Sequence, residues 1–511
     1  MAGAHWGMGR GTRMSAEDLS SAPGFRVSDL IRHGAEPPPV ALFTRWPSYP
    51  WLIVGVTCIG AFMGQVDASI VQLALPTLGR VFDCTLESVS WVALAYLLGV
   101  AAFLPIFAQL CQMFGRKLLY IIGFVVFTGA SALCGFAPDL GALIAFRFLQ
   151  GFGGAMLGAN SMALVVTSTD KSLRARALGV YAGAQAVGIS AGPVIGGLLL
   201  GTLGWPWVFW INVPFGLLAI VASWFVLPVT AQQNSNQTFD WRGGLLLAPA
   251  LAFAVLALNQ VSAWGLTSPA LLGTVGVAIV LIFLFVRQEH GARSPLIDLA
   301  LLDEPSFLAG ALACALSYAM LYGMFFLASF ALVRGYEESA VAAGLKLAII
   351  PISLGIVAPF AGGLADRMGT RLLSVAGMAI CFIALLALTA VVMQPVANLW
   401  TGALGLAAFG AGLGLFIAPN NHATINVAPA NLSGVAGGFL NLTRILGTVA
   451  GVASASAMLS WQIQVARGSA ERRLAAFSPH HFVEAVAGGL IMLAVFALIA
   501  GAVSLIRKPS A

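Results

Sequence analysis

The sequence predicts an all-α polytopic membrane protein with fourteen transmembrane helices, arranged as two six-helix bundles plus two central helices. Of the 511 residues, 59% are apolar and only 9% are charged, whereas a soluble globular protein carries about 25% charged residues. A chain with so little polar surface requires the bilayer as its solvent, so each span must satisfy its own backbone hydrogen bonds as a helix. Apolar runs of about 20 residues, the length that crosses a bilayer, recur along the chain.

Two long uncharged stretches fix the number of expected spans. The first, residues 177–239, is divided by a Gly-Trp-Pro-Trp turn at 204–207, and the second, residues 243–286, is divided by a polar break from Asn259 to Pro269. Fourteen spans are therefore better supported than twelve. We expect the spans at roughly 50–75, 89–110, 118–137, 141–166, 177–200, 207–228, 243–260, 268–286, 306–332, 340–364, 372–393, 398–423, 433–460 and 485–506.

The distribution of lysine and arginine predicts the orientation in the membrane. An even number of spans puts both termini on one side, and the tails and loops of that side carry 17 of the 25 Lys and Arg residues, against five in the opposite loops. Cytoplasmic loops are enriched in these residues, so we expect a multi-pass protein of the inner (cytoplasmic) membrane with both termini cytoplasmic. The same bias explains the net charge of +6, which therefore does not indicate nucleic-acid binding.

An internal repeat indicates two homologous halves. The stretch at 105–123 recurs 254 residues later, at 359–377, with six identities in 19 positions. Both copies fall in the loop after the second span of a six-span set. Paired halves of this kind are typical of secondary transporters, whose substrate site lies near the bilayer midplane between the halves. The predicted regions are an N-terminal cytoplasmic tail (1–48), an N-terminal six-helix bundle (49–228), a linker with two extra transmembrane helices (229–305) and a C-terminal six-helix bundle (306–508).

Ionisable groups inside spans are costly and therefore indicate function. Of the 19 Asp and Glu residues, only Asp67 lies well inside an expected span. Asp67 and Arg147 lie on antiparallel helices at similar depths, roughly 12 Å and 9 Å from the outer ends at about 1.5 Å per residue. We expect them to meet, with Asp67 as the proton carrier and Arg147 controlling the loading and release of the proton. The alternative is a permanent ion pair that only holds helices together.

Other polar side chains at interior depths are candidates for lining a substrate cavity, although interhelical hydrogen bonding is the commoner use of such groups. The candidates are Gln65, Gln150, Asn160, Gln185, Asn441 and Arg444. Arg444, deep in the thirteenth span, either anchors an anionic group of a substrate or pairs with backbone carbonyls. Lys346, near the outer end of the tenth span, is expected to extend its side chain toward the interface.

Four motifs add more specific signals. The first span contains VDASIVQLALP (66–76) and the fourth contains RFLQGFGGA (147–155). The fifth contains GISAGPVIGG (188–197), and the sixth begins with WPWVFWINVPFG (205–216). In these motifs, the chain resembles the major facilitator superfamily and, within it, the fourteen-helix drug:proton antiporter family of multidrug efflux permeases. The resemblance covers nearly all of residues 50–508 and implies the major facilitator fold.

The fifth-span motif is associated in that family with exporters. It comprises Gly188, Gly192, Pro193, Gly196 and Gly197. Small residues four apart let helix backbones approach closely, and a proline inside a helix removes a hydrogen bond and favours a kink. We therefore expect a closely packed, kinked helix beside the cavity, which can seal one side of the membrane against leak.

The loop motif of the superfamily, Gly-x-Leu-Ala-Asp-Arg-x-Gly-Arg-Lys, is altered in the first copy of the repeat. There, AQLCQMFGRK (108–117) has Gln112 in place of the aspartate, which is thought to latch the two halves in one state. The second copy keeps that aspartate and is expected to take more of the latch role. The gating residues implied by the resemblance are Gln112, Gly115, Arg116, Lys117, Asp366, Arg367, Gly369 and Arg371.

Several patterns that indicate other functions are missing or misplaced. The chain contains no Walker A sequence and no HExxH motif, and its six cysteines are scattered without a CxxC pair, so we expect neither ATP drive within this chain nor a metal site. GISAG (188–192) matches the nucleophile-elbow pattern, but Ser190 lies in mid-span rather than on a strand-to-helix turn. The sequence therefore does not predict an enzyme.

These features predict a proton-coupled antiporter that exports small amphipathic or cationic compounds by alternating access, driven by the proton gradient without a cofactor. The expected partners are a small-molecule substrate, protons and the lipid bilayer. Exporters of this type in double-membraned bacteria often work with a periplasmic adaptor, so the resemblance allows one. Two alternatives remain. A transporter of the same fold for a specific metabolite or organic anion is favoured by Arg444 and Lys346, and a non-transporting membrane sensor or scaffold is disfavoured by Asp67 and the exporter motif.

Overall fold

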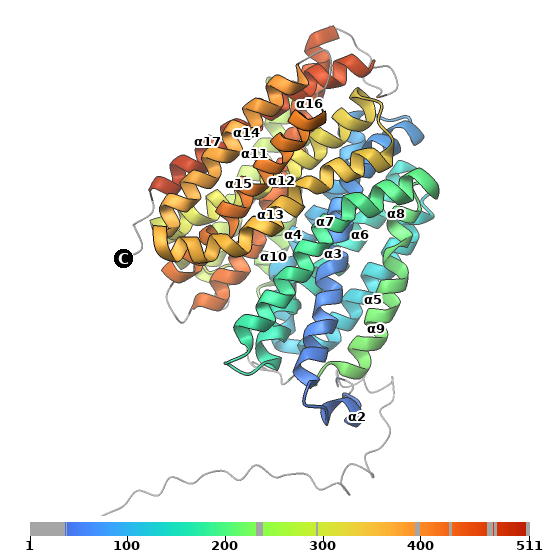
Figure 1. Cartoon of the computed structure of the whole chain (residues 1–511). Helices are drawn as coiled ribbons and strands as arrows, with labels where there is room; N and C mark the ends of the chain where they lie inside the picture. The colour runs from blue at the N-terminus through green and yellow to red at the C-terminus, as the bar shows by residue number, and fades with distance from the viewer. Residues whose placement is uncertain are drawn as a thin grey trace, which may run out of the picture.

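The fold is a bundle of long helices (Figure 1). The computed structural model describes residues 36, 38–230, 239–292, 295–393, 399–428, 432–467, 474 and 478–506. These residues form 14 helices long and apolar enough to cross a membrane, and no β-strand. The predicted fold class and number of spans are thereby confirmed. Most of the predicted tail, at residues 1–35 and 37, lies outside the described residues.

The helices follow one another along the chain with short connections. Their bounds are α2 Ala41–Thr44, α3 Tyr49–Val81, α4 Leu86–Phe114, α5 Arg116–Gly135, α6 Leu140–Ser168, α7 Arg174–Thr202, α8 Trp207–Trp210, α9 Asn212–Val226, α10 Trp241–Trp264, α11 Pro269–Gly291, η1 Leu299–Asp303, α12 Pro305–Phe330, η2 Ala331–Gly335, α13 Ala340–Met368, α14 Thr370–Val392, α15 Leu399–Val427, α16 Ser433–Arg467 and α17 Pro479–Leu505. The α8 and α9 segments form one span, and α12 with η2 forms another.

Several helices extend beyond the apolar runs that predict them. The first span, expected at 50–75, is the 33-residue α3, about 50 Å long at 1.5 Å per residue and so longer than the roughly 30 Å bilayer core. The polar break expected to begin at Asn259 begins only after Trp264. Asn259 is instead buried inside α10, where its amide nitrogen donates to Ser90 Oγ of α4 at 2.7 Å. An interhelical partner thus keeps this polar residue within the helix.

The two halves repeat the same packing. Equivalent helix pairs make the most extensive contacts in each half: α4 with α6 and α13 with α15, α5 with α6 and α14 with α15, and α3 with α7 and α12 with α16. The repeated segments also share a turn, because Gly115 and Gly369 join consecutive helices with φ of +97° and +84°. Glycine adopts such angles without steric cost. The sequence repeat therefore corresponds to a repeat of structure.

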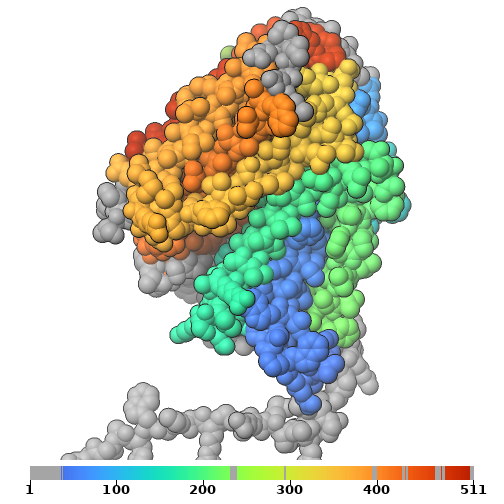
Figure 2. Space-filling model, viewed as in Figure 1, coloured from blue at the N-terminus to red at the C-terminus, as the bar shows by residue number. Residues whose placement is uncertain are grey.

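The halves meet through two equivalent helix pairs, α7 with α13 and α16 with α4. Helix α10 packs on α4, α16 and α11, so the two extra helices cover the α4–α16 side of the interface. The α7–α13 side lies on the opposite side of the molecule, in front in Figure 1. Figure 2 shows these two helices adjoining on the surface.

Contacts between the halves are closest at one end of the molecule. We call the side where α3 begins and α17 ends the terminus face, and the opposite side the far face. At the far face, a Cβ added to Gly197 or Gly344 would collide with the carbonyl oxygens of Ala340 and Pro193, respectively. Toward the terminus face, a Cβ added to Gly183 of α7 or to Gly355 or Gly362 of α13 meets nothing within 4 Å. The helices therefore seal the far face and diverge toward the terminus face (Figure 1).

Within the N-terminal half, Gly151 sets the distance between α6 and α4. A Cβ at this position would overlap the carbonyl oxygen of Tyr96. We predict that Gly151→Ala lowers the free energy of unfolding by about 1–3 kcal/mol through overpacking, measured as a lower melting temperature of the purified protein. Gly129→Ala is the matched control, because Gly129 is an exposed helical glycine with nothing within 4 Å of an added Cβ. Equal melting temperatures for the two variants would contradict the prediction.

Candidate functional site

The structure joins Asp67 and Arg147 in a fully buried ion pair. Arg147 Nη1 lies 2.7 Å from Asp67 Oδ2, and the two side chains are 1% and 0% exposed. Asp67 lies in the middle of α3, and Arg147 lies in the second turn of α6, which begins at the far face. The similar depths inferred from the sequence thus correspond to direct contact.

Two amides complete the surroundings of the Asp67 carboxylate. Gln150 Nε2 and Asn212 Nδ2 donate to Asp67 Oδ1 at 2.8 Å and 3.0 Å. Both amides also donate to Ser131 Oγ, each at 3.1 Å, and Ser131 in turn donates to the Phe209 carbonyl at 2.9 Å. The carboxylate therefore accepts three hydrogen bonds inside a network contributed by α3, α5, α6, α8 and α9.

Arg147 is held from several directions. Its Nε donates to the Val92 carbonyl of α4 at 2.9 Å, and its Nη1 donates to Gln150 Oε1 at 2.5 Å. The guanidinium carbon lies 4.3 Å from the centre of the Tyr96 ring, a cation–π contact. A planar guanidinium suits such combined stacking and hydrogen bonding better than an ammonium group. These contacts fix the position of the Arg147 side chain. They are made by uncharged groups, so the Asp67 carboxylate is the contact that neutralises its positive charge.

The sequence did not indicate several members of this network, among them the Phe209 carbonyl. Asn212 lies inside the motif WPWVFWINVPFG (205–216), but the sequence alone assigned this residue no role. Ser131, Tyr96 and Val92 have no distinctive sequence signal, because a serine, a tyrosine and a backbone carbonyl are ordinary in apolar helices. Only the three-dimensional arrangement identifies them as partners of Asp67 and Arg147.

The glycines of the fifth-span motif connect this network to the interface between the halves. An added Cβ would collide with α3 at Gly188 (2.8 Å from the Phe62 carbonyl), at Gly192 (against Ser69) and at Gly196 (2.7 Å from Ile70). These three glycines therefore bring α7 into direct contact with the helix that carries Asp67. The next residue, Gly197, instead faces the Ala340 backbone of α13.

The predicted cavity residues occupy two different environments. Gln150 and Asn160 have no exposed surface: Gln150 belongs to the Asp67 network, and Asn160 Nδ2 donates to the Met156 carbonyl of its own helix at 3.0 Å. Contrary to the prediction, the structure does not place these two side chains on a cavity wall, because packed helices enclose both of them. Among the described residues, Asn160 Oδ1 has no hydrogen-bond partner. Gln65, Gln185, Asn441 and Arg444 are half-buried.

Arg444 lies among tyrosines. Its guanidinium carbon is 5.6 Å from the centre of the Tyr318 ring, a cation–π contact, and it interacts electrostatically with Tyr181 and Tyr322. Tyr322 Oη donates to Gln65 Oε1 at 3.5 Å, across the interface between the halves. None of the ion pairs among the described residues includes Arg444.

The two gating loops of the terminus face differ in their contacts. In the first, Gln112 is exposed, and the carboxylate near the loop comes from Glu36, which accepts from the Leu118 amide at 3.1 Å and the Thr230 amide at 2.5 Å. Arg116 N donates to Thr230 Oγ1 at 2.8 Å, and Lys117 Nζ donates to the Leu227 carbonyl at 2.6 Å. An acid at a helix N-terminus is favourable, so Glu36 supplies at α5 a charge that Gln112 cannot.

The second gating loop, between α13 and α14, is largely exposed. Asp366 and Arg367 are exposed, Arg371 is half-buried and none of the ion pairs among the described residues includes them. The loop is available for contact in another arrangement of the halves.

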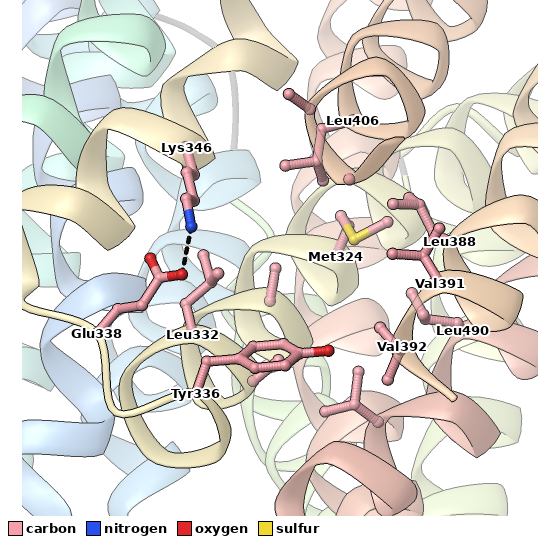
Figure 3. A pocket seen from close by; sticks show the side chains of 15 residues that line it. Met324, Leu332, Tyr336, Glu338, Lys346, Leu388, Val391, Val392, Leu406 and Leu490 are labelled. Carbon is pink, nitrogen blue, oxygen red and sulfur yellow. Dashed lines mark hydrogen bonds and ion pairs between the residues drawn. The ribbon is translucent and has the colours of Figure 1, made fainter. Parts of the chain in front are cut away.

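A separate cavity of about 100 Å³ lies within the C-terminal half (Figure 3). Its walls come from α12, η2, α13, α14, α15 and α17 and are mainly apolar. Lys346 Nζ extends along one wall to pair with Glu338 Oε1 in the loop before α13. The side chain thus extends toward the far face, the direction expected from the sequence. In the part of the chain that the structure describes, no group of three or more His, Cys, Asp or Glu is placed to hold a metal ion.

The buried ion pair yields a stability prediction. Asp67→Asn and Arg147→Gln should each lower the free energy of unfolding by about 3–5 kcal/mol, because each leaves the other charge buried without its partner. The double variant should lose much less than the sum of the two losses. Thermal unfolding of the purified proteins measures this cycle. Additive losses would mean that the two charges do not stabilise one another.

Comparisons with known proteins agree with this architecture. The sequence matches the Major Facilitator Superfamily over residues 57–452. It is 31% identical over 403 residues to the riboflavin transporter RibZ of Clostridioides difficile, covering 78% of this chain and 86% of that protein. It is 33% identical over 408 residues to the multidrug resistance protein Stp of Mycobacterium tuberculosis, covering 79% of this chain and 75% of that protein.

Solved structures show the same fold. A bacterial homologue of the human lysosomal transporter Spinster, crystallised in an inward-facing and unoccupied conformation, superposes with a TM-score of 0.67 at 15% identity, covering 90% of this chain and 97% of that one. The extent of the family match and the identity to full-length relatives settle the classification. The chain belongs to the major facilitator superfamily, a family of membrane transporters rather than enzymes, and its relatives include multidrug efflux proteins.

Proposed function

We propose that this transporter is a proton-coupled antiporter that exports small amphipathic compounds, cationic ones included, from the cytoplasm by alternating access. The observation that carries the proposal is the Asp67–Arg147 pair, a carboxylate and a guanidinium that are 0% and 1% exposed. A buried charge pair costs free energy compared with apolar packing, and ionisable groups at this depth are typical of proton and substrate pathways. Relatives named as multidrug resistance proteins support the export of several compounds.

Proton coupling follows from the electrostatics of the network. A proton that binds Asp67 removes the only carboxylate in contact with the Arg147 guanidinium among the described ion pairs. The buried arginine then lacks a neutralising partner, which is unfavourable unless the helices rearrange. Release of the proton restores the pair. Each protonation state of Asp67 therefore favours a different helix arrangement.

The fifth-span glycines supply a mechanical route from Asp67 to the seal between the halves. Gly188, Gly192 and Gly196 pack α7 on α3 around Asp67, and Gly197 packs the same helix on α13. A shift of α3 on protonation must move α7, because at these positions α7 has no side chain of its own and packs directly on Phe62, Ser69 and Ile70 of α3. With the termini cytoplasmic, as the charge distribution predicts, the far face is periplasmic and the structure corresponds to the inward-open state of the cycle.

The membrane potential is sufficient to drive export. One charge that crosses about 100 mV gains about 2.3 kcal/mol, enough for a roughly 50-fold gradient before any pH difference is added. No cofactor is needed for this mechanism. The exposed second loop, with Asp366 and Arg367, is the segment we expect to contact the other half when the terminus face closes.

A second candidate function is transport of one specific metabolite or organic anion. Two observations favour this second function. Arg444 is a half-buried arginine between the halves, and none of the ion pairs among the described residues includes it. One relative is named as a riboflavin transporter. Expression in an efflux-deficient host separates the two functions. Raised tolerance to several unrelated compounds supports multidrug export, and altered uptake or export of a single metabolite supports the second function.

The role of Asp67 is testable in proteoliposomes. Asp67→Asn should abolish substrate-dependent proton movement, since an amide cannot carry the proton, while substrate exchange without a proton gradient continues. Asp139→Asn is the matched control, because Asp139 is an exposed acid that caps α6 and should leave coupling unchanged. Unchanged proton movement in Asp67→Asn would show that the ion pair is only structural.

The seal at the far face is testable separately. Gly344→Val should disfavour the arrangement in which α13 touches α7, since overpacking by about 1–3 kcal/mol corresponds to a shift in population of about 5- to 150-fold. The expected result is slower transport and a longer distance between spin labels at Leu203 and Glu337, both exposed near the far face. Gly355→Val, at a position with nothing within 4 Å, should change neither quantity; an unchanged distance in Gly344→Val would exclude this contact as the seal.

A further inference from the structure

A cluster of polar and aromatic side chains lies between the two halves, about Arg444. Its members come from α3 and α7 in one half and from α12 and α16 in the other. We define the Arg444 cluster as Gln65, Tyr181, Gln185, Tyr318, Tyr322 and Arg444. Contacts join its members in three pairs: the Arg444 guanidinium lies 5.6 Å from the centre of the Tyr318 ring, Tyr322 Oη donates to Gln65 Oε1 at 3.5 Å, and Gln185 Nε2 donates to Tyr181 Oη at 3.4 Å.

The charge in this cluster is positive. Arg444 is absent from the ion pairs of the described residues, and its guanidinium lies against the ring of Tyr318. The nearest deep carboxylate along the first span, Asp67, is 0% exposed and accepts three hydrogen bonds from its own network. Asp67 therefore presents no free carboxylate to a molecule bound between the halves, whereas Arg444, which is half-buried, presents a cation.

We propose that the Arg444 cluster binds planar aromatic compounds that carry a carboxylate or phenolate group, and that it disfavours cationic ones. This inference rests on the proposed export function and narrows its substrate class, because it keeps the amphipathic compounds and removes the cationic ones as preferred substrates. The guanidinium has the geometry to bind an anionic oxygen pair through parallel hydrogen bonds. Tyr318 is half-buried and offers its edge and the face away from Arg444 to an aromatic ring system, whereas Tyr181 and Tyr322 are buried.

The same chemistry explains the discrimination against cations. Tyrosine rings alone would attract a cation through their faces. Here Arg444 already occupies the face of Tyr318, so a cationic ligand meets a like charge. The amides of Gln65 and Gln185 add neutral donors and acceptors for the polar edge of a ligand. A neutral phenolic compound is accepted, and an anionic one binds more tightly.

Binding of two xanthene dyes to the purified full-length protein tests the inference. Fluorescein and rhodamine 123 have similar size and shape, but fluorescein is an anion at mildly alkaline pH and rhodamine 123 is a cation. Fluorescence polarisation should report tighter binding of fluorescein. Arg444→Gln should weaken fluorescein at least about tenfold, the loss of a charge-assisted hydrogen bond, and should strengthen rhodamine 123. Arg444→Lys, which keeps the charge, should weaken fluorescein less.

Two features make this test decisive even if a variant is less stable. Opposite changes for the two dyes in Arg444→Gln cannot arise from misfolding, which weakens both. Arg242→Gln makes the same change in net charge at an exposed arginine at the start of α10 and should alter neither affinity. Equal or tighter binding of rhodamine 123 by the unaltered protein, absence of fluorescein binding, or unchanged fluorescein affinity in Arg444→Gln would each overturn the inference.

Failure of the proposed export function can be distinguished from failure of the proposed dye selectivity. The binding measurement needs no proton gradient, so loss of proton coupling leaves the preference between the dyes intact. Conversely, a protein that couples protons through Asp67 but prefers rhodamine 123 retains the export function and lacks the proposed selectivity.

Discussion

The N-terminal half is organised around the burial of one negative and one positive charge in the middle of the membrane. Neither Asp67 nor Arg147 tolerates an apolar environment alone, so helices α3, α4, α5, α6, α8 and α9 must arrange their polar atoms around the pair. The surrounding network consists of neutral donors and acceptors, which stabilise the ion pair without replacing either charge. Any process that neutralises Asp67 therefore changes the balance of forces across six helices at once.

Close backbone contact lets this local change reach the interface between the halves. Glycines on α7 remove the side chains that would otherwise cushion movement between α3 and α7, and Gly197 and Gly344 do the same between α7 and α13. Packed helices of this kind move as units, because interiors at crystal-like density do not deform continuously. The arrangement is asymmetric, since α10 covers the equivalent α4–α16 contact and leaves only the α7–α13 side uncovered by extra helices.

The sequence was most informative where a residue type has one favourable role inside a membrane-spanning helix. Low charge and long apolar runs predict the fourteen spans, and the repeat predicts two homologous halves, which the structure shows with matching turns at Gly115 and Gly369. A carboxylate deep in a span must find a cation, which is why Asp67 and Arg147 were paired correctly. Amides and hydroxyls have several uses, so Asn212 and Ser131 were missed, and Gln150 and Asn160 were assigned to a cavity although packed helices bury both side chains. Asn259 was placed at a break for the same reason.

The contact of Glu36 also constrains the order in which the protein assembles. Glu36 precedes the first span, but its partners Leu118 and Thr230 follow it by 82 and 194 residues. During synthesis its carboxylate is made before any span and reaches its final partners only after the sixth span has been completed. The contact therefore closes the N-terminal half as a unit, and an intermediate that ends before the sixth span can contain Leu118 but lacks Thr230. Translation through Thr230 thus marks the point at which this half can acquire its native terminus face.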